Sequence, residues 1–319
     1  MPARRPRIGI LTGGGDCPGL NAVIRAVVKS GHRLGYETVG FLRGYEGLVD
    51  PVAWTPLDPA VVANILTQGG TILGSSNTGR FTALVGENDR VAIDPKLLTA
   101  AATTLEQLGI CGLVCVGGDG SLSIAQQCHE HGMPVVGVPK TIDNDLGATA
   151  FTFGFDSAVA TATDALDRLH TTAASHERVM VLEVMGRHAG WIALHAGDNG
   201  QRRQVRLGGV GDVVAGEIAR RLGREVRAVV LGHLQRGGAP TTFDRVLATQ
   251  FGAHAVRLVH EGRFGEMVCY RPPDIASVPI AAAVSRLSLV DVGSSAVLAA
   301  RALGISFGDD PPATGACAG

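Results

Sequence analysis

Residues 133–145 read MPVVGVPKTIDND, a strand-like run that passes directly into a loop of charged residues. The apolar run from Met133 to Val138 is typical of a buried strand, and the polar residues follow at its carboxyl end. In an open α/β sheet, ligands bind in the crevice beyond the carboxyl ends of the strands. An ammonium beside two carboxylates suits a site that holds phosphate and also removes a proton. The alternative is an Asx-rich turn that only caps the next helix.

Strand-like and helix-like runs alternate on both sides of this stretch. Strands are expected at 8–11, 37–42, 112–116, 179–184 and 228–231, and helices at 21–30, 59–67, 95–108, 121–129, 156–174, 189–196, 212–221 and 242–260. This alternation predicts an α/β fold built on a doubly wound parallel sheet. The pattern restarts after Asp145, which predicts a second lobe. No strand signal appears between Ala196 and Glu225, so the second lobe has few strands for a core of its own.

Composition excludes several classes of function. The net charge of −1 gives no global field that would favour nucleic acid or an acidic membrane. No apolar run approaches the length of a membrane span, and the Arg-rich start is too short for a signal peptide. The six cysteines form no CxxC pair, and Cys111 and Cys115 are expected to be buried free thiols. We therefore expect a reduced, cytoplasmic protein with no nucleic-acid or membrane partner, and a disordered tail at 308–319.

Two glycine-rich loops follow strands of the first lobe. Residues 12–16 read TGGGD, and successive glycines before a helix let backbone N–H groups converge on an anion. Residues 117–121 read GGDGS, with Ser121 as a candidate N-cap and Asp119 as a candidate ligand of Mg²⁺. Neither loop has the spacing of a dinucleotide fingerprint or a P-loop. Each alone could be a tight turn, but two in one sheet favour an anion site.

Strand ends of the second lobe carry basic residues. Residues 183–188 read EVMGRH and residues 232–238 read GHLQRGG. An arginine at a strand end offers a forked donor to the oxygens of a sugar phosphate.

The chain resembles the 6-phosphofructokinases over most of Arg7 to about Arg286, and within that family it is most similar to an actinobacterial-type branch with ATP- and pyrophosphate-dependent members. The strings that carry the resemblance, in the family's order, are LTGGGDCPGLNAVIRAV, GGDGS, GVPKTIDNDL, EVMGRHAGW and LGHLQRGGAPTTFDRVLAT. The resemblance implies Mg²⁺-assisted transfer of a phosphoryl group to the 1-hydroxyl of fructose 6-phosphate in glycolysis. It also implies a homo-oligomer, a dimer or a tetramer, whose sites are shared between subunits.

The resemblance assigns roles to single residues. Asp143 would be the catalytic base, with Lys140, Thr141 and Asp145 as its catalytic neighbours, and Asp119 the acid associated with Mg²⁺. The positions that match nucleotide contacts are Gly15, Tyr45, Gly118, Gly120 and Ser121. The positions that match sugar-phosphate contacts are Met185, Gly186, Arg187, His233 and Arg236, together with Arg178 and Arg227, which would reach the substrate of a neighbouring subunit. The implied domains are a phosphoryl-donor lobe of 1–140 and about 255–307, and a fructose 6-phosphate lobe of 141–254.

Two positions bear on the phosphoryl donor in opposite ways. Gly120 leaves room for a nucleotide where an Asp accompanies pyrophosphate use, whereas Lys140 stands where pyrophosphate enzymes of the family carry Lys. We give Gly120 more weight, because a side chain that fills the nucleotide site excludes ATP sterically and a lysine need not. ATP is therefore the expected donor, and a pyrophosphate-dependent enzyme is the alternative.

Two departures from the family open a further alternative. Asn77 stands where the family has an arginine that steadies the transferring phosphoryl group, and Arg80 is a nearby candidate to replace it. The chain also lacks several dozen family residues after about residue 197, including a strand that ends in a sugar-binding Glu. A shortened second lobe and weaker sugar binding are expected, and the further alternative is a non-catalytic paralogue that binds nucleotide.

Overall fold

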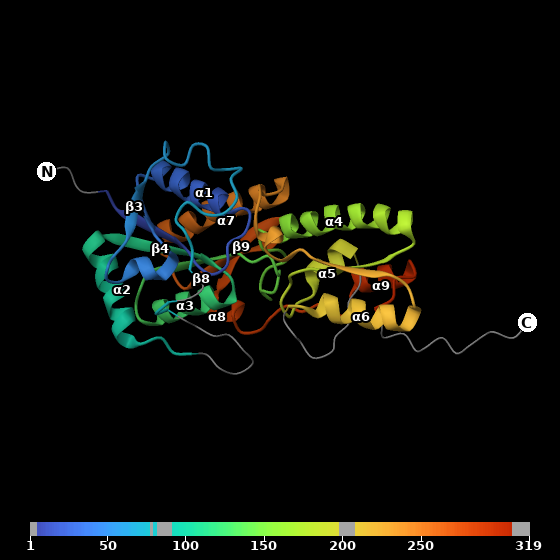
Figure 1. Ribbon diagram of the computed structural model, residues 1–319. Coiled ribbons are helices and arrows are strands. Elements are labelled where there is room, and N and C mark those ends of the chain that lie inside the picture. The colour runs from blue at the N-terminus through green and yellow to red at the C-terminus, as the bar shows by residue number, and fades with distance from the viewer. Residues whose placement is uncertain (1–4, 77–78, 82–90, 198–207, 308–319) are drawn as a thin grey trace, which may run out of the picture. The chain divides into compact units, whose positions relative to one another are not determined.

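The computed structural model describes residues 5–76, 79–81, 91–197 and 208–307, which fall into two compact units (Figure 1). Unit 1 comprises Met1–Ser157 and Arg236–Ser288, and unit 2 comprises Ala158–Gln235 and Leu289–Gly319. Each unit has its own sheet, so each is described by itself. None of the helices in the described part of the chain is long and apolar enough to cross a membrane.

Unit 1 is built on one mixed sheet in the order β3-β2-β1-β4-β5-β8-β9. Its strands are β1 (Arg7–Thr12), β2 (Glu37–Phe41), β3 (Trp54–Leu57), β4 (Ile110–Gly117), β5 (Val135–Pro139), β8 (Glu266–Arg271) and β9 (Asp274–Pro279). The central strands run parallel, and β3 and β9 pair antiparallel at the two edges. The strand order reverses between β1 and β4, which is the kind of position where open α/β sheets bind ligands.

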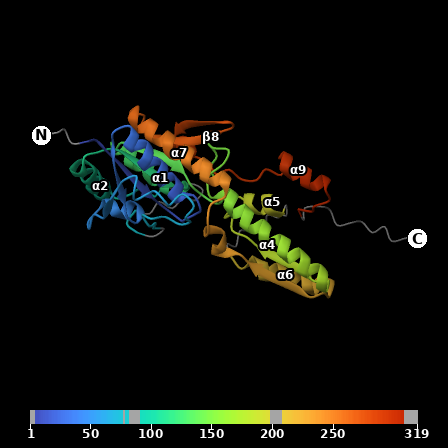
Figure 2. The same cartoon turned by 90° about the horizontal axis from the view of Figure 1, so that it is seen from above.

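Helices cover both faces of this sheet. They are α1 (Leu20–Arg33), α2 (Pro95–Leu108), α3 (Asp119–Glu130), α7 (Thr242–His260) and α8 (Ile280–Ala283), with the 3-10 helix η1 (Gly44–Leu48). Helices α1 and α7 lie side by side in both views (Figures 1 and 2). Gly252 permits this approach, because a Cβ there would come within 2.7 Å of the Val23 carbonyl oxygen. Residues 113–116 of β4 are at most 1% exposed, which confirms a strand buried on both faces.

Unit 2 is thinner. Its elements are α4 (Phe155–His176), β6 (Val179–Glu183), α5 (Trp191–Gly197), α6 (Val210–Leu222), β7 (Val226–Val230), the 3-10 helix η2 (Gly232–Arg236) and α9 (Ser295–Ala302). The first residues of α4 and the last residue of η2, Arg236, belong to unit 1. Strands β6 and β7 form a parallel two-stranded sheet, and α6 packs on it. Every residue of β6 is only half-buried, because the described part of the chain supplies no third strand. A small cluster around Leu194, Val297, Ala300 and Phe307 forms the apolar core.

The predicted fold class, two parallel-rich α/β lobes with a shortened second one, agrees with this architecture. The helix predicted at Pro59–Thr67 is wrong, because the Asp58 side chain accepts hydrogen bonds from the N–H groups of Ala60 and Val61 and sets separate turns. Cys111 is exposed rather than buried, since it stands at the end of β4 outside the helical cover, whereas Cys115 is buried and free as predicted. The predicted disordered tail, 308–319, lies outside the described residues.

The boundaries of the two units differ from those of the predicted domains at three places. Residues 141–157 belong with unit 1 because this segment is hydrogen-bonded to β8, where the Ala150 N–H donates to the Tyr270 carbonyl at 3.0 Å. Residues 236–254 belong there because α7 packs along α1. Residues 289–307 belong with unit 2, where Val297 and Phe307 join the small core.

Candidate active site

Three loops meet at the carboxyl ends of β1, β4 and β5. The N–H of Gly13 donates to the Val116 carbonyl at 2.8 Å, and the N–H of Lys140 donates to the Gly117 carbonyl at 2.9 Å. Because β1 and β4 flank the point where the strand order reverses, the loops border the crevice expected of this fold. The TGGGD, GGDGS and KTIDND segments, each predicted to follow a strand, are therefore neighbours in space.

Ser121 explains why the first two loops need glycine. A Cβ on Gly13 would lie 2.7 Å from Ser121 Oγ, and a Cβ on Gly117 would lie 2.2 Å from Ser121 Cβ. Gly14 has a φ of 75°, a left-handed conformation that favours glycine. The backbone of both loops therefore approaches Ser121 more closely than a residue with a side chain would allow.

A third segment, residues 69–76, braces the glycine loop. Thr12 Oγ1 donates to the Gly74 carbonyl at 2.8 Å, and the N–H of Gly14 donates to the Ser76 carbonyl at 3.3 Å. Ser75 Oγ donates to the Gly14 carbonyl. These bonds hold the glycine loop from both sides, so its conformation is set before any ligand arrives.

Lys140 lies beneath the glycine loop. Its side chain is 3% exposed, and its Nζ donates to the Gly15 carbonyl. Burial lowers the pKa of Lys140, and the nearby Arg236 guanidinium acts in the same direction. Arg236 Nη1 donates to the Asp16 carbonyl at 3.1 Å, and a Cβ on Gly15 would lie 2.7 Å from that nitrogen. Two cations therefore converge on residues 15–16, an arrangement that suits a polyanion.

The loop 141–145 is buried and internally braced. Asp143 is 7% exposed, and its N–H donates to Thr141 Oγ1 at 3.1 Å, while that hydroxyl lies 3.4 Å from Asp143 Oδ2. Asn144 has a φ of 50°, and its Oδ1 accepts from the N–H of Thr152 at 2.9 Å. Thr152 Oγ1 in turn donates to the Thr141 carbonyl at 2.7 Å. The carboxylate of Asp143 is thus held by a fixed backbone, as a proton acceptor must be.

Asp119 opens α3 at the end of β4 and is half-buried. The described residues contain no group of three or more His, Cys, Asp or Glu side chains that could hold a metal ion. Mg²⁺ does not need such a group, because it usually binds through one or two carboxylates, several waters and the phosphates of a substrate. Asp119 offers one such carboxylate at the end of β4.

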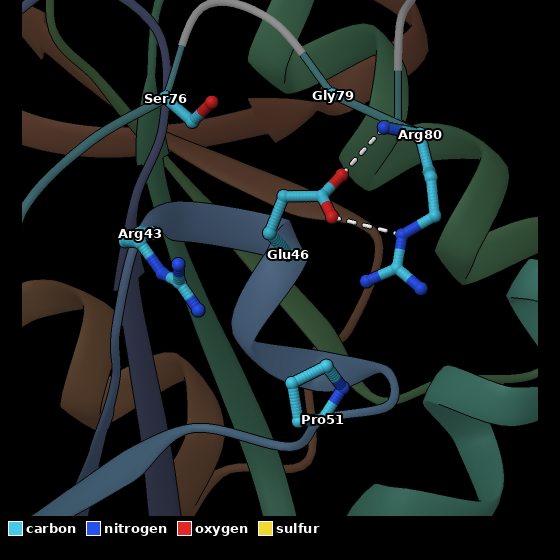
Figure 3. Close-up of a pocket in the computed structure, with 6 residues that line it drawn as sticks. All are labelled: Arg43, Glu46, Pro51, Ser76, Gly79 and Arg80. Carbon is cyan, nitrogen blue, oxygen red and sulfur yellow. Dashed lines mark hydrogen bonds and ion pairs between the residues drawn. The ribbon is translucent and has the colours of Figure 1, made fainter.

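A pocket of about 340 Å³ opens beside the loops (Figure 3). Its lining residues are Arg43, Glu46, Pro51, Ser76, Gly79 and Arg80. Four of these also line a smaller hollow with Gly14, Tyr45, Phe81, Ser121 and Ile124. The pocket is therefore continuous with the glycine loop, and its volume lies in the range of about 300–1,000 Å³ that is common for small-molecule sites.

Glu46 organises one wall of this pocket. Its carboxylate accepts from Arg80 Nε at 2.9 Å and from the Arg80 N–H at 2.6 Å, the two bonds drawn in Figure 3. Partial burial opposes ionisation, but the bonds from Arg80 prevail and lower the pKa of Glu46. Arg80 Nη1 also donates to the Asp50 carbonyl at 2.9 Å, so Arg80 is committed to this wall. Asn77 lies outside the described residues.

Tyr45 lines the smaller hollow. Its hydroxyl donates to the Ser121 carbonyl at 2.7 Å, and the side chain is 5% exposed. Burial raises the pKa of Tyr45 well above its ordinary value, so the phenol stays neutral. Gly118 lies close to Lys140, because a Cβ on Gly118 would be 3.3 Å from the Lys140 carbonyl oxygen. Gly15, Tyr45, Gly118 and Ser121 are thus brought to one place, together with Gly120 in the first turn of α3.

In unit 2, the segments after β6 and β7 are joined. The N–H of Met185 donates at 2.7 Å to Oε1 of Gln235, whose side chain is fully buried. Gly186 and Arg187 have φ values of 143° and 52°, so the chain turns sharply there. Arg187 and His233 are both exposed. Four of the residues predicted to contact sugar phosphate, Met185, Gly186, Arg187 and His233, thus share the carboxyl end of the small sheet, whereas Arg236 is held at Asp16 within unit 1.

Arg178 and Arg227 lie at the amino end of the same sheet. Glu225 bridges them, with Oε2 2.6 Å from Arg178 Nε and Oε1 2.5 Å from Arg227 Nη2. The hydrogen bond from Arg178 lowers the pKa of Glu225, and Arg227 adds to the effect. The sequence predicted the two arginines as site residues but did not predict Glu225. It also did not predict Arg43 and Glu46 as pocket residues, although both lie within two residues of Tyr45 in the sequence.

Comparison with known proteins supports one family. A family model described as phosphofructokinase matches residues 7–207 and 198–259. An ATP-dependent 6-phosphofructokinase of Chloroflexus aggregans is 46% identical over 358 residues, which cover 97% of this chain and 100% of the relative. A pyrophosphate–fructose 6-phosphate 1-phosphotransferase of Streptomyces coelicolor is 45% identical, covering 89% of this chain and 96% of that protein. A solved phosphofructokinase of Saccharomyces cerevisiae superposes with a TM-score of 0.74 at 29% identity, over 88% of this chain and 45% of that one.

Proposed function

Because the chain belongs to the phosphofructokinase family, we propose that it phosphorylates the 1-hydroxyl of fructose 6-phosphate with ATP as the donor. The observation that carries the proposal is the buried, braced loop 141–145, which holds Asp143 beside two glycine-rich loops at the point where the strand order reverses. A coupled assay with fructose 6-phosphate, Mg²⁺ and ATP tests it. Turnover that depends on all three is expected, and no turnover above background would refute it.

In this mechanism Asp143 accepts the proton of the sugar 1-hydroxyl as the new bond to phosphorus forms. The Thr141 hydroxyl lies close enough to orient the carboxylate, and the backbone bonds of Asn144 keep it in place. The Lys140 ammonium offsets negative charge on the donor phosphates. Asp119 and Asp145 are the carboxylates that would hold Mg²⁺, which neutralises charge on the phosphates when bound. Asp143, fixed before substrate arrives, loses little orientation on binding.

The pocket beside Tyr45 supports ATP as the donor. It continues from the glycine loop, and no side chain projects from Gly120 to fill the space. Lys140 supports the second candidate, a pyrophosphate-dependent enzyme, because its ammonium lies at Gly15 where a short donor would need a cation. Relatives of similar identity carry both names.

A Lys140→Gly variant separates the two donors. We expect it to abolish any pyrophosphate use and to spare ATP use, since ATP is also held through its pocket. Assays with each donor at saturating sugar phosphate provide the measurement. A variant that keeps pyrophosphate activity and loses ATP activity would reverse the ranking. Binding of ATP with no turnover with either donor would instead favour the non-catalytic paralogue.

The small sheet supports an oligomer with shared sites. Met185 and His233 follow the carboxyl ends of β6 and β7, whereas Arg178 and Arg227 lie at the amino ends. Strands of five residues are about 16 Å long at about 3.3 Å per residue. One sugar phosphate is shorter than that distance, so the arginines are placed to serve the substrate of another subunit. Analytical ultracentrifugation checks this, and an active monomer would contradict it.

The missing segment bears on the sugar site. The alignment with the Chloroflexus relative spans 358 positions although this chain has 319 residues, so the relative carries residues that this chain lacks. The two matches to the family model overlap at 198–207, the region where the gap is expected. We infer that the family's sugar-binding Glu has no counterpart and that fructose 6-phosphate binds weakly, since a lost buried acceptor costs about 1–3 kcal/mol.

A further inference from the structure

The carboxylate of Glu225 is bound to both arginines at the amino end of the small sheet. Because Val179 pairs with Val226 in parallel register, Arg178 lies opposite Glu225, and Arg227 lies two residues further along the same face of β7. Each carboxylate oxygen takes one guanidinium group, at 2.6 Å and 2.5 Å. The three groups therefore form a cluster with one negative and two positive charges.

A phosphate would use the same donors. Arginine forks bind carboxylate and phosphate oxygens in the same way, so a phosphate and the Glu225 carboxylate compete for one pair of guanidinium groups. Exposed side-chain fractions of 33% for Arg178, 64% for Arg227 and 43% for Glu225 leave the cluster open to solvent. Exposed ion pairs are weak, so a doubly charged phosphate can displace the carboxylate.

We propose that Glu225 is an internal competitor for the phosphate site formed by Arg178 and Arg227. It neutralises part of their charge when no sugar phosphate is present, and it must move aside when the 6-phosphate of a neighbouring subunit's substrate binds. Glu225 is thus a residue that sets the affinity for substrate and takes no part in the chemical step. This inference rests on the proposed function for its substrate, but the competition itself can be measured with inorganic phosphate alone.

The chain offers a matched control in the same unit. Glu217 of α6 also bridges two arginines, with Oε1 2.7 Å from Arg220 Nη2 and 2.6 Å from Arg221 Nε. All three residues lie on one helix face, and none of them is assigned to substrate. Glu217→Gln therefore removes the same charge from the same kind of bridge and should leave phosphate binding unchanged.

The test compares Glu225→Gln with Glu217→Gln in the full-length protein. Two quantities are measured: the Kd of inorganic phosphate by isothermal titration, and the KM of fructose 6-phosphate in the coupled assay. For Glu225→Gln we expect both to fall about fivefold, the size of a weak exposed ion pair, with the effect on KM rather than kcat. In an Arg227→Gln background the same change at Glu225 should have at most half of this effect, because one of its two partners is gone.

The outcomes separate the possible roles of Glu225. A Kd for phosphate that rises or stays unchanged in Glu225→Gln overturns the proposal, since a purely positioning carboxylate would weaken the site when removed. An equal effect in Glu217→Gln also overturns it, because the cause would be net charge alone. If no variant turns over fructose 6-phosphate, the proposed function fails, but the phosphate Kd still decides whether Glu225 competes.

Discussion

Strands β4 and β6 each precede a loop that carries predicted site residues, yet they differ in burial. Residues 113–116 of β4 are at most 1% exposed, in a sheet covered by helices on both faces. All residues of β6 are only half-buried, in a sheet of two strands within the described chain. The loops of unit 1 are therefore fixed by a dense core, whereas the sugar-phosphate residues of unit 2 stand on a thin support. Catalytic geometry should be robust and sugar binding should be the weak step.

The largest effect that tests this comparison is on the chemical step. Asp143→Asn removes the proposed base without changing the shape of the braced loop, so kcat should fall by about 10²–10⁴-fold while sugar binding persists. His233→Ala, in unit 2, should instead raise KM with a smaller change in kcat. Steady-state kinetics and equilibrium binding of fructose 6-phosphate measure both. A kcat for Asp143→Asn within tenfold of the parent protein would contradict the assignment.

A second effect concerns pH and the buried Asp244 of unit 1. Burial raises the pKa of Asp244 from 3.8 to about 6, and the negative charge of Asp156 adds to this rise. The hydrogen bonds that Asp244 accepts from the N–H and Oγ of Ser157, at 2.8 and 2.6 Å, lower the pKa but do not outweigh burial. The pKa in the folded protein lies above that of the unfolded chain, so protonation favours folding. This stability is present below about pH 4 and is lost as the pH rises through about 6. Two pKa units correspond to about 3 kcal/mol.

Asp244→Asn provides the measurement, because asparagine does not titrate. The free energy of unfolding of the parent protein minus that of the variant should fall by about 3 kcal/mol between about pH 4 and pH 7. The protein has two tryptophans, Trp54 in β3 of unit 1 and Trp191 in α5 of unit 2. In a Trp191→Phe background, tryptophan fluorescence therefore follows unit 1 alone. A difference that is independent of pH would show that Asp244 does not titrate in this range.

The sequence predicted the parts of the site that are local in the chain. The loops TGGGD, GGDGS and KTIDND each follow an apolar run, so their place at strand ends could be inferred from pattern alone. The bridge from Glu225 to Arg178 could not, because it depends on the register of two strands 47 residues apart. The same holds for Glu46 and Arg80, 34 residues apart, which meet only through the fold. Strands β8 and β9 were missed because the Pro272-Pro273 pair between them resembles a break rather than a hairpin.

The smallest effect contrasts one glycine of each unit. Gly117 is the buried last residue of β4, and a Cβ there would lie 2.2 Å from Ser121 Cβ. Gly117→Ala should therefore destabilise unit 1 by about 1–3 kcal/mol and disturb the phosphate crevice. Gly216 stands exposed within α6, with nothing within 4 Å of where a Cβ would be. Gly216→Ala should therefore stabilise unit 2 by about 0.5–1 kcal/mol through helix propensity. Denaturant unfolding followed by Trp54 for the first variant and by Trp191 for the second measures each unit by itself. If Gly117→Ala were as harmless as Gly216→Ala, the crevice of unit 1 would be as loosely packed as unit 2, and the contrast between a rigid catalytic frame and a thin sugar-binding frame would fail.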